Sequence, residues 1–364
     1  MSTRSLNQRA RSTLRWLKPT VVDETDRIGL TLLTIQTLVL VATAAGFATQ
    51  SIWTTPLLLA FVLVSAIVWV TRQAAAARVL TFLMTISTVV ILGLIAFFLF
   101  AEAMPVFEQM GVRIVLPLDG EMWDPGTNTF SLIPMIWGTA ITTFVAILVA
   151  GPLGVAGALF ISEIAPEQVR EVVKPGVEIL AGIPSIVYGF IGFTIINPYV
   201  STELSTGTGA LLPIGVVIGF MALPTVVSVA EDAISTVPES MKSGALAMGA
   251  TDWQTMKSVT VPAAFSGISA AVLLGLGRAI GETMAATVMI AHVKELPQPA
   301  YDVFDSGETL TTLIAGNFGP AVGTEYLLSA LFAAGVVLFV IVTAISIVSQ
   351  YIEERMKRKL GGDA

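Results

Sequence analysis

Long apolar stretches separated by short polar links dominate this 364-residue chain. An α-helix needs about 20 apolar residues to cross the hydrocarbon core of a bilayer. Eight stretches are long enough, and we interpret each as a membrane-spanning helix. They cover residues 29–49, 53–71, 79–101, 132–161, 177–199, 210–230, 263–291 and 326–350. The pattern predicts an all-α integral membrane protein, a polytopic bundle of about eight transmembrane helices.

The composition supports this class and excludes several kinds of site. Hydrophobic residues make up 54% of the chain and charged residues only 12%, which is far from the balance of a typical soluble domain. The chain contains no cysteine and one histidine, His292. Disulfides and thiolate metal sites are therefore excluded, and we expect no metal site and no cofactor bound by this chain.

Lysine and arginine residues fall almost entirely on one side of the predicted spans. If the N-terminus is cytoplasmic, Arg113 and Lys294 are the basic residues left in the outer segments. Cytoplasmic loops are normally the ones rich in these residues. The sequence thus predicts a multi-pass protein of the cell membrane with both termini in the cytoplasm.

One predicted span, 263–291, contains two opposite charges. Arg278 and Glu282 are four residues apart, so in a continuous helix they would share a face. A charge near the bilayer centre costs about 2.5–3.5 kcal/mol on insertion scales, and such residues commonly mark a solute pathway. A buried ion pair that only fixes helix packing remains the alternative.

Spans four to seven are also rich in glycine and proline. Gly215 and Gly219, and again Gly277 and Gly281, have the four-residue spacing that lets helices pack closely. The first two spans are plain apolar runs without a charge inside them. We interpret those two spans as an accessory module.

The segment 231–262, between spans six and seven, predicts two short helices. Pro238 suits a first helical turn, Gly249 suits a left-handed helix end, and Thr251 with Gln254 has the spacing of a capping box. The second helix should end near Pro262. Such an elbow would carry an apolar docking surface, although a connector lying on the membrane is the alternative. The surface would comprise Met248, Ala250, Trp253 and Met256.

The elbow also carries a family resemblance. Ala245, Gly249, Val259 and Pro262 follow an order that resembles the EAA loop of ABC-importer permeases. Further segments resemble the PstC family of phosphate permeases, and the likeness covers about residues 79–352. These segments are Glu163-Ile-Ala-Pro166, 178–190, Ala222-Leu-Pro-Thr225 and 277–285. The chain departs from the usual loop at Ser243, where Glu is common, and at Gly244.

The resemblance implies a type I ABC-importer core of six spans plus two extra N-terminal spans. The expected organisation has four parts. They are a basic cytoplasmic arm (1–28), the accessory module (29–75), the permease core with its coupling loop (76–352), and a basic cytoplasmic tail (353–364).

The resemblance further implies partners: a homologous PstA-like permease, two PstB-like ATP-binding subunits, and an extracytoplasmic PstS-like phosphate-binding protein. The outer loops, with acidic residues such as Asp302, Asp305 and Glu308, are expected to meet that binding protein. The sequence lacks a Gly-x-x-x-x-Gly-Lys-[Ser/Thr] motif, so ATP and Mg²⁺ are expected on the partner subunits.

The expected function is therefore inward phosphate transport by alternating access. Arg278 would compensate the anion, Glu282 would neutralise or orient Arg278, and Thr283 would offer a hydroxyl. Ala245, Met248, Gly249, Ala250, Trp253, Val259 and Pro262 would couple to the ATPase. An intramembrane phosphoryl-handling enzyme, a permease for another oxyanion and a passive channel remain alternatives. The enzyme would need a nucleophile or metal ligands, for which the spans offer only Ser and Thr.

Overall fold

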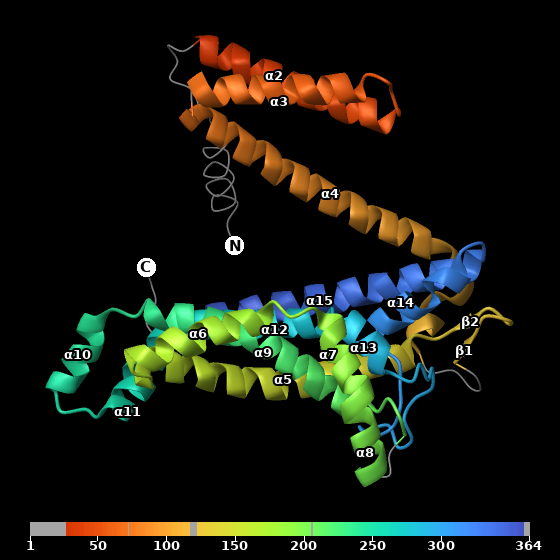
Figure 1. Ribbon diagram of the computed structural model, residues 1–364. Coiled ribbons are helices and arrows are strands. Elements are labelled where there is room, and N and C mark those ends of the chain that lie inside the picture. The colour runs from red at the N-terminus through yellow and green to blue at the C-terminus, as the bar shows by residue number, and fades with distance from the viewer. Residues whose placement is uncertain (1–26, 72, 117–121, 205–206, 360–364) are drawn as a thin grey trace, which may run out of the picture. The chain divides into compact units, whose positions relative to one another are not determined.

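The computed structural model describes residues 27–71, 73–116, 122–204 and 207–359 (Figure 1). Within them, six helices are long and apolar enough to cross a membrane, and a bent helix pair would make a seventh span. A shorter apolar helix covers Thr34–Phe47. The prediction of an all-α polytopic protein with about eight spans is confirmed. Residues 1–26 of the expected basic arm and 360–364 of the expected tail lie outside the described residues.

The chain divides into two compact units at Phe97. In the first unit, α2 (Arg27–Ala48) and α3 (Thr54–Thr71) form a helical hairpin. Gln36 donates a hydrogen bond from Nε2 to Oγ of Ser65 at 2.9 Å, which joins the two helices. The long helix α4 (Gln73–Met110) begins in this unit and ends in the second.

The second unit is a helical bundle with a small β-hairpin near one end (Figure 1). Helices α5, α9 and α12 run side by side at its centre, and α14 packs against α15. Their bounds are α5 Ile133–Leu159, α9 Leu211–Ser235, α12 Val261–Ile280, α14 Leu310–Ala321 and α15 Glu325–Lys359. A 3₁₀ helix, η1 (Gly111–Val115), precedes the strands β1 (Trp123–Asp124) and β2 (Thr129–Phe130).

Glycines allow α5 and α9 to approach closely. A Cβ atom on Gly215 would lie 2.7 Å from Cβ of Val145, and one on Gly219 would lie 2.7 Å from Cβ of Val149. The predicted packing role of this glycine pair is confirmed. At Gly277, by contrast, no atom of the described residues lies within 4 Å of a Cβ built there, so no such contact forms within the chain.

The predicted span 177–199 is sharply bent. The structure has two helical segments, Glu167–Ala181 (α6) and Ser185–Leu204, which are bent by 88°. The second segment comprises α7 (Ser185–Ile191), the π-helical turn η3 (Gly192–Ile196) and α8 (Asn197–Leu204). Gly182 ends α6, and Pro184 disfavours a helical conformation at the residue before it.

The predicted span 263–291 is also interrupted. Helix α12 ends at Ile280, and a short helix α13 (Met284–Met289) follows after a break at Gly281–Thr283. Arg278 therefore lies in the last turn of α12, whereas Glu282 lies in the break. The prediction that both occupy one continuous helix is wrong.

The elbow has the predicted start but not the predicted end. Helix α10 (Glu239–Ala247) leads to Gly249 at φ +90°, and the Thr251–Gln254 capping box opens α11 (Asp252–Thr255). The chain then continues through a π-helical turn, η4 (Met256–Thr260), directly into α12. The predicted break near Pro262 is wrong, because Thr260 is already helical and the helix continues past Pro262.

Candidate functional site

Arg278 joins the two central helices of the bundle. Its Nη1 donates a hydrogen bond to Oγ1 of Thr225 on α9 at 3.1 Å. Both side chains are half-buried. Among the described residues, no carboxylate lies within ion-pair distance of Arg278.

Glu282 has a different partner. Its Oε1 accepts a hydrogen bond from the backbone N–H of Ala285 at 2.9 Å, at the start of α13. The expected direct pairing of Glu282 with Arg278 is therefore not formed in this structure. The carboxylate instead stabilises the restart of the helix after the break.

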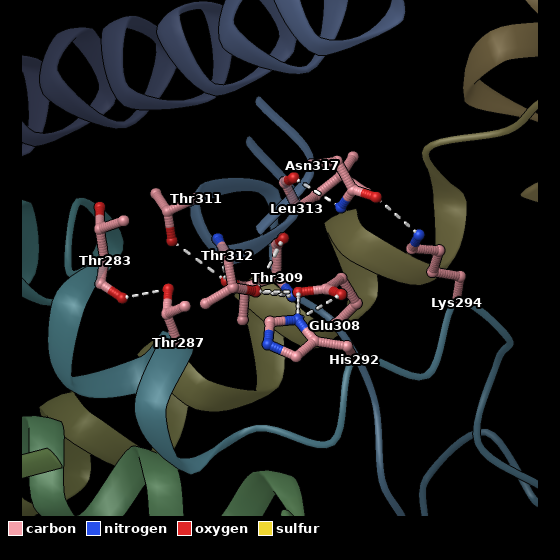
Figure 2. Close-up of polar contacts among 10 residues, drawn as sticks. All are labelled: Thr283, Thr287, His292, Lys294, Glu308, Thr309, Thr311, Thr312, Leu313 and Asn317. Atoms are coloured by element: carbon pink, nitrogen blue, oxygen red, sulfur yellow. Dashed lines mark hydrogen bonds and ion pairs between the residues drawn. The ribbon is translucent and has the colours of Figure 1, made fainter. Parts of the chain in front are cut away.

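Hydroxyl groups hold the main chain around the break. Thr283 donates to the carbonyl oxygen of Gly281 at 3.2 Å. Thr287 donates to the carbonyl oxygen of Thr283 at 2.7 Å (Figure 2). From α14, Thr311 donates to the carbonyl oxygen of Glu282 at 2.8 Å. The break is thus a structured element, braced by a neighbouring helix.

The two interrupted elements pack against each other. A Cβ on Gly189 of α7 would lie 2.7 Å from Cα of Ala285 on α13. Asn197 donates from Nδ2 to the carbonyl oxygen of Met289 at 2.8 Å. Discontinuous helices that meet near the middle of a bundle are a common setting for substrate sites in secondary transporters.

A buried acid lies beside this region, and sequence reasoning missed it. Glu308 is 0% exposed and accepts a hydrogen bond from the hydroxyl of Thr312, while Nδ1 of His292 lies 3.0 Å from its Oε2 (Figure 2). Glu308 lies in the expected loop before α14, but its side chain is buried and presents no carboxylate at the surface. The spacing of Thr309 and Thr312, which form the capping box that opens α14, could have indicated that an ordered helix begins directly after Glu308.

Burial raises the pKa of Glu308 above its ordinary value, because a charged carboxylate loses its hydration there. Hydrogen bonds from Thr312 and the nearby His292 and Lys294 act in the opposite direction. Lys294 itself donates to Oδ1 of Asn317 at 2.9 Å (Figure 2). The cluster anchors the loop before α14 to the bundle.

The elbow exposes part of its predicted apolar surface. Met248 is 91% exposed and Trp253 is 67% exposed, on either side of Gly249. Met256 is only 6% exposed, so its predicted place on this surface is wrong; the π-helical turn directs it inward. The other expected coupling residues, Ala245, Ala250, Val259 and Pro262, are half-buried.

In the part of the chain that the structure describes, no group of three or more His, Cys, Asp or Glu side chains could hold a metal ion.

Comparisons with known proteins agree with this architecture. Residues 150–358 match the family described as "binding-protein-dependent transport system inner membrane component". A probable ABC transporter permease protein of Bacillus subtilis, YqgH, is 38% identical over 72% of this chain and 85% of the relative. The phosphate transport system permease protein PstC of Mesorhizobium japonicum is 34% identical over 83% of this chain and 93% of the relative.

A solved structure has a similar fold. One chain of a bacterial alginate ABC transporter, crystallised with an alginate pentasaccharide-bound periplasmic protein, superposes with a TM-score of 0.53. It is 18% identical, and the match covers 76% of this chain and 94% of that one.

Proposed function

Because the chain belongs to the family of binding-protein-dependent transport system inner membrane components, we propose that it is the permease subunit of an ATP-driven importer of inorganic phosphate. Similarity to relatives such as the phosphate transport system permease protein PstC supports phosphate as the substrate. The observation that carries the proposal is the charge of Arg278 between α12 and α9, with no carboxylate of the described residues within ion-pair distance.

Phosphate suits this arginine chemically. The guanidinium group stays protonated and presents a planar set of donors that matches phosphate oxygens. Its present partner, the hydroxyl of Thr225, is neutral and can be exchanged for a phosphate oxygen without leaving an unpaired carboxylate behind. Arg278 is therefore the proposed anion contact, and Thr283 the proposed hydroxyl contact at the break.

Glu282 has the opposite effect on an anion. The backbone N–H of Ala285 holds this carboxylate in place. Glu282 is four residues from Arg278 in the sequence, and its negative charge would repel phosphate. We assign it the role of limiting how tightly phosphate binds, which allows release. The same carboxylate also stabilises the broken helix on which the site depends.

The proposed assembly has four kinds of subunit. This chain pairs with a homologous PstA-like permease, two cytoplasmic PstB-like subunits bind ATP and Mg²⁺, and a PstS-like protein delivers phosphate from outside. Both termini and the elbow face the cytoplasm in this arrangement. The exposed Met248 and Trp253 then dock on the ATP-binding subunit, with Gly249 setting the turn between them.

Transport follows from this arrangement by alternating access. Closure of the ATP-binding subunits moves the elbow, and η4 passes that movement into α12, since the two are continuous. The last turn of α12 carries Arg278. Arg278 therefore lies on the same continuous helical segment as Trp253 of the docking surface.

The test is uptake of labelled phosphate by cells that lack this chain but retain its partners. Wild-type chain should restore uptake, and excess sulfate should not compete. Competition by sulfate would assign the permease to another oxyanion. Failure of the wild-type chain to restore uptake would refute the phosphate assignment.

A further inference from the structure

A part-buried ion pair connects the first helix of the elbow to the segment that follows α5. Helix α10 has no buried residue of its own. Its Lys242 places Nζ 2.6 Å from Oε1 of Glu163, and the two side chains are only 14% and 13% exposed. An ion pair this well shielded is screened little by salt or water.

Glu163 lies on an unusual segment. It belongs to the π-helical turn η2 (Phe160–Ile164), which follows α5 directly. From α6, Arg170 donates hydrogen bonds to the carbonyl oxygens of Ile161 at 2.8 Å and Ser162 at 2.7 Å. This turn is therefore held by a side chain on each side, one from α6 and one from the elbow.

The connection from the elbow to α12 is also π-helical. The turn η4 joins α11 to α12, and the hydroxyls of Thr255 and Thr260 are buried there without a hydrogen-bond partner. Single π-helical turns are rare and occur frequently at functional sites. The ion pair to η2 and the link to α12 thus both involve a turn whose hydrogen bonding departs from the α-helix, whereas residues 236–238 join the elbow to α9 without one.

We propose that Lys242 and Glu163 are positioning residues that transmit movement of the elbow to α5. This inference rests on the proposed function, in which the elbow receives that movement from an ATP-binding subunit. The continuous path through η4 moves α12, and the ion pair moves α5 with it. Because α5 and α12 both pack on α9, the three helices would then move together.

The test compares phosphate uptake per ATP hydrolysed in the reconstituted complex. The neutral double variant Lys242→Met with Glu163→Gln removes the link without leaving a buried unpaired charge. We expect it to retain ATP hydrolysis while uptake per ATP falls roughly tenfold, an effect on coupling that a merely structural pair would not produce. The reversed pair Lys242→Glu with Glu163→Lys should recover most of the uptake.

The matched control is Glu171→Gln, which makes the same change as Glu163→Gln at an exposed position on α6. It should leave uptake per ATP unchanged. If the neutral double variant keeps wild-type uptake per ATP, or if the reversed pair loses as much as the neutral pair, the inference is overturned.

A second measurement does not depend on the transported ion. The chain has no cysteine, so a single cysteine at the exposed Leu153 of α5 can carry a unique spin label. ATP should change the label's mobility in the otherwise wild-type complex, and the neutral double variant should abolish that change. An unaltered response would refute the coupling role even if the complex carries an ion other than phosphate.

Discussion

The guanidinium of Arg278 donates a hydrogen bond to the hydroxyl of Thr225 at 3.1 Å, across the contact between α12 and α9. The two residues are 53 positions apart in the sequence. A cation held by a neutral hydroxyl keeps most of its capacity to attract an anion. The pair therefore allows the charge and the hydrogen bond of Arg278 to be tested separately.

Gly249→Val should uncouple transport from ATP hydrolysis. Gly249 has φ +90°, and a β-branched residue in that conformation is strained by about 1–3 kcal/mol. No atom lies within 4 Å of a Cβ built there, so the effect would come from the backbone alone. The measurement is uptake and ATP hydrolysis in the same vesicles.

Gly244→Ala is the matched control for that prediction. Gly244 lies within α10, also with no atom within 4 Å of its Cβ position, and it has no positive φ. Alanine should be tolerated or slightly stabilising there. Normal uptake in a well-expressed Gly249→Val variant would contradict the docking role of the elbow.

Thr311→Val should lower uptake several-fold with little loss of expression. It removes the hydroxyl that holds the carbonyl oxygen of Glu282, a hydrogen bond worth about 0.5–1.5 kcal/mol. The variant Thr311→Ser restores the donor and should recover uptake. Equal uptake by both variants would show that the brace from α14 has no part in transport.

Gly219→Ala should destabilise the bundle by about 1–3 kcal/mol, because the added methyl group would overpack the helix contact. Its Cβ would lie 2.7 Å from Cβ of Val149 and 2.9 Å from the carbonyl oxygen of Ala146. Gly277→Ala, which has open space, is the control. Thermal unfolding in detergent should separate the two variants; identical melting temperatures would contradict the packing described here.

Glu308→Gln should change how stability depends on pH. The folded-state pKa of Glu308 is raised by burial, so the native protein binds its proton more tightly than the unfolded chain does. The contribution of Glu308 to stability is thus greatest at low pH and is lost as pH rises through the folded-state pKa. Melting temperatures of both proteins measured across acidic and neutral pH test this.

The wild-type melting temperature should fall relative to that of Glu308→Gln as pH increases. A difference that stays constant with pH would contradict the assignment of the raised pKa to this group.

Local sequence signals predicted local structure well. The Thr251–Gln254 spacing correctly predicted a capping box, and Gly249 correctly predicted a left-handed turn. Both features depend on a few neighbouring residues and their backbone conformations. The apolar stretches likewise predicted most spans, since length and composition largely decide whether a helix can cross a membrane.

The breaks in the helices were harder to predict because they depend on residues distant in sequence. The residues near Glu282 in the sequence do not indicate that Thr311 donates a hydrogen bond to its carbonyl oxygen. Nor do they indicate that Ala285 lies against Gly189. Hydropathy also failed at Glu308, where burial is made possible by contacts with His292 and Thr312. In each case tertiary contacts satisfy groups that a sequence pattern places in water or in a regular helix.

The roles of Arg278 and the coupling residues stay predictions. The most direct test compares two variants in labelled phosphate uptake. Arg278→Gln removes the charge, whereas Thr225→Val removes the hydrogen bond between the helices but keeps the charge. Arg278→Gln should abolish uptake while Thr225→Val retains most of it, with both complexes assembled. If the two variants lose uptake equally, Arg278 acts through helix packing, and the account of Arg278 as the anion contact is contradicted.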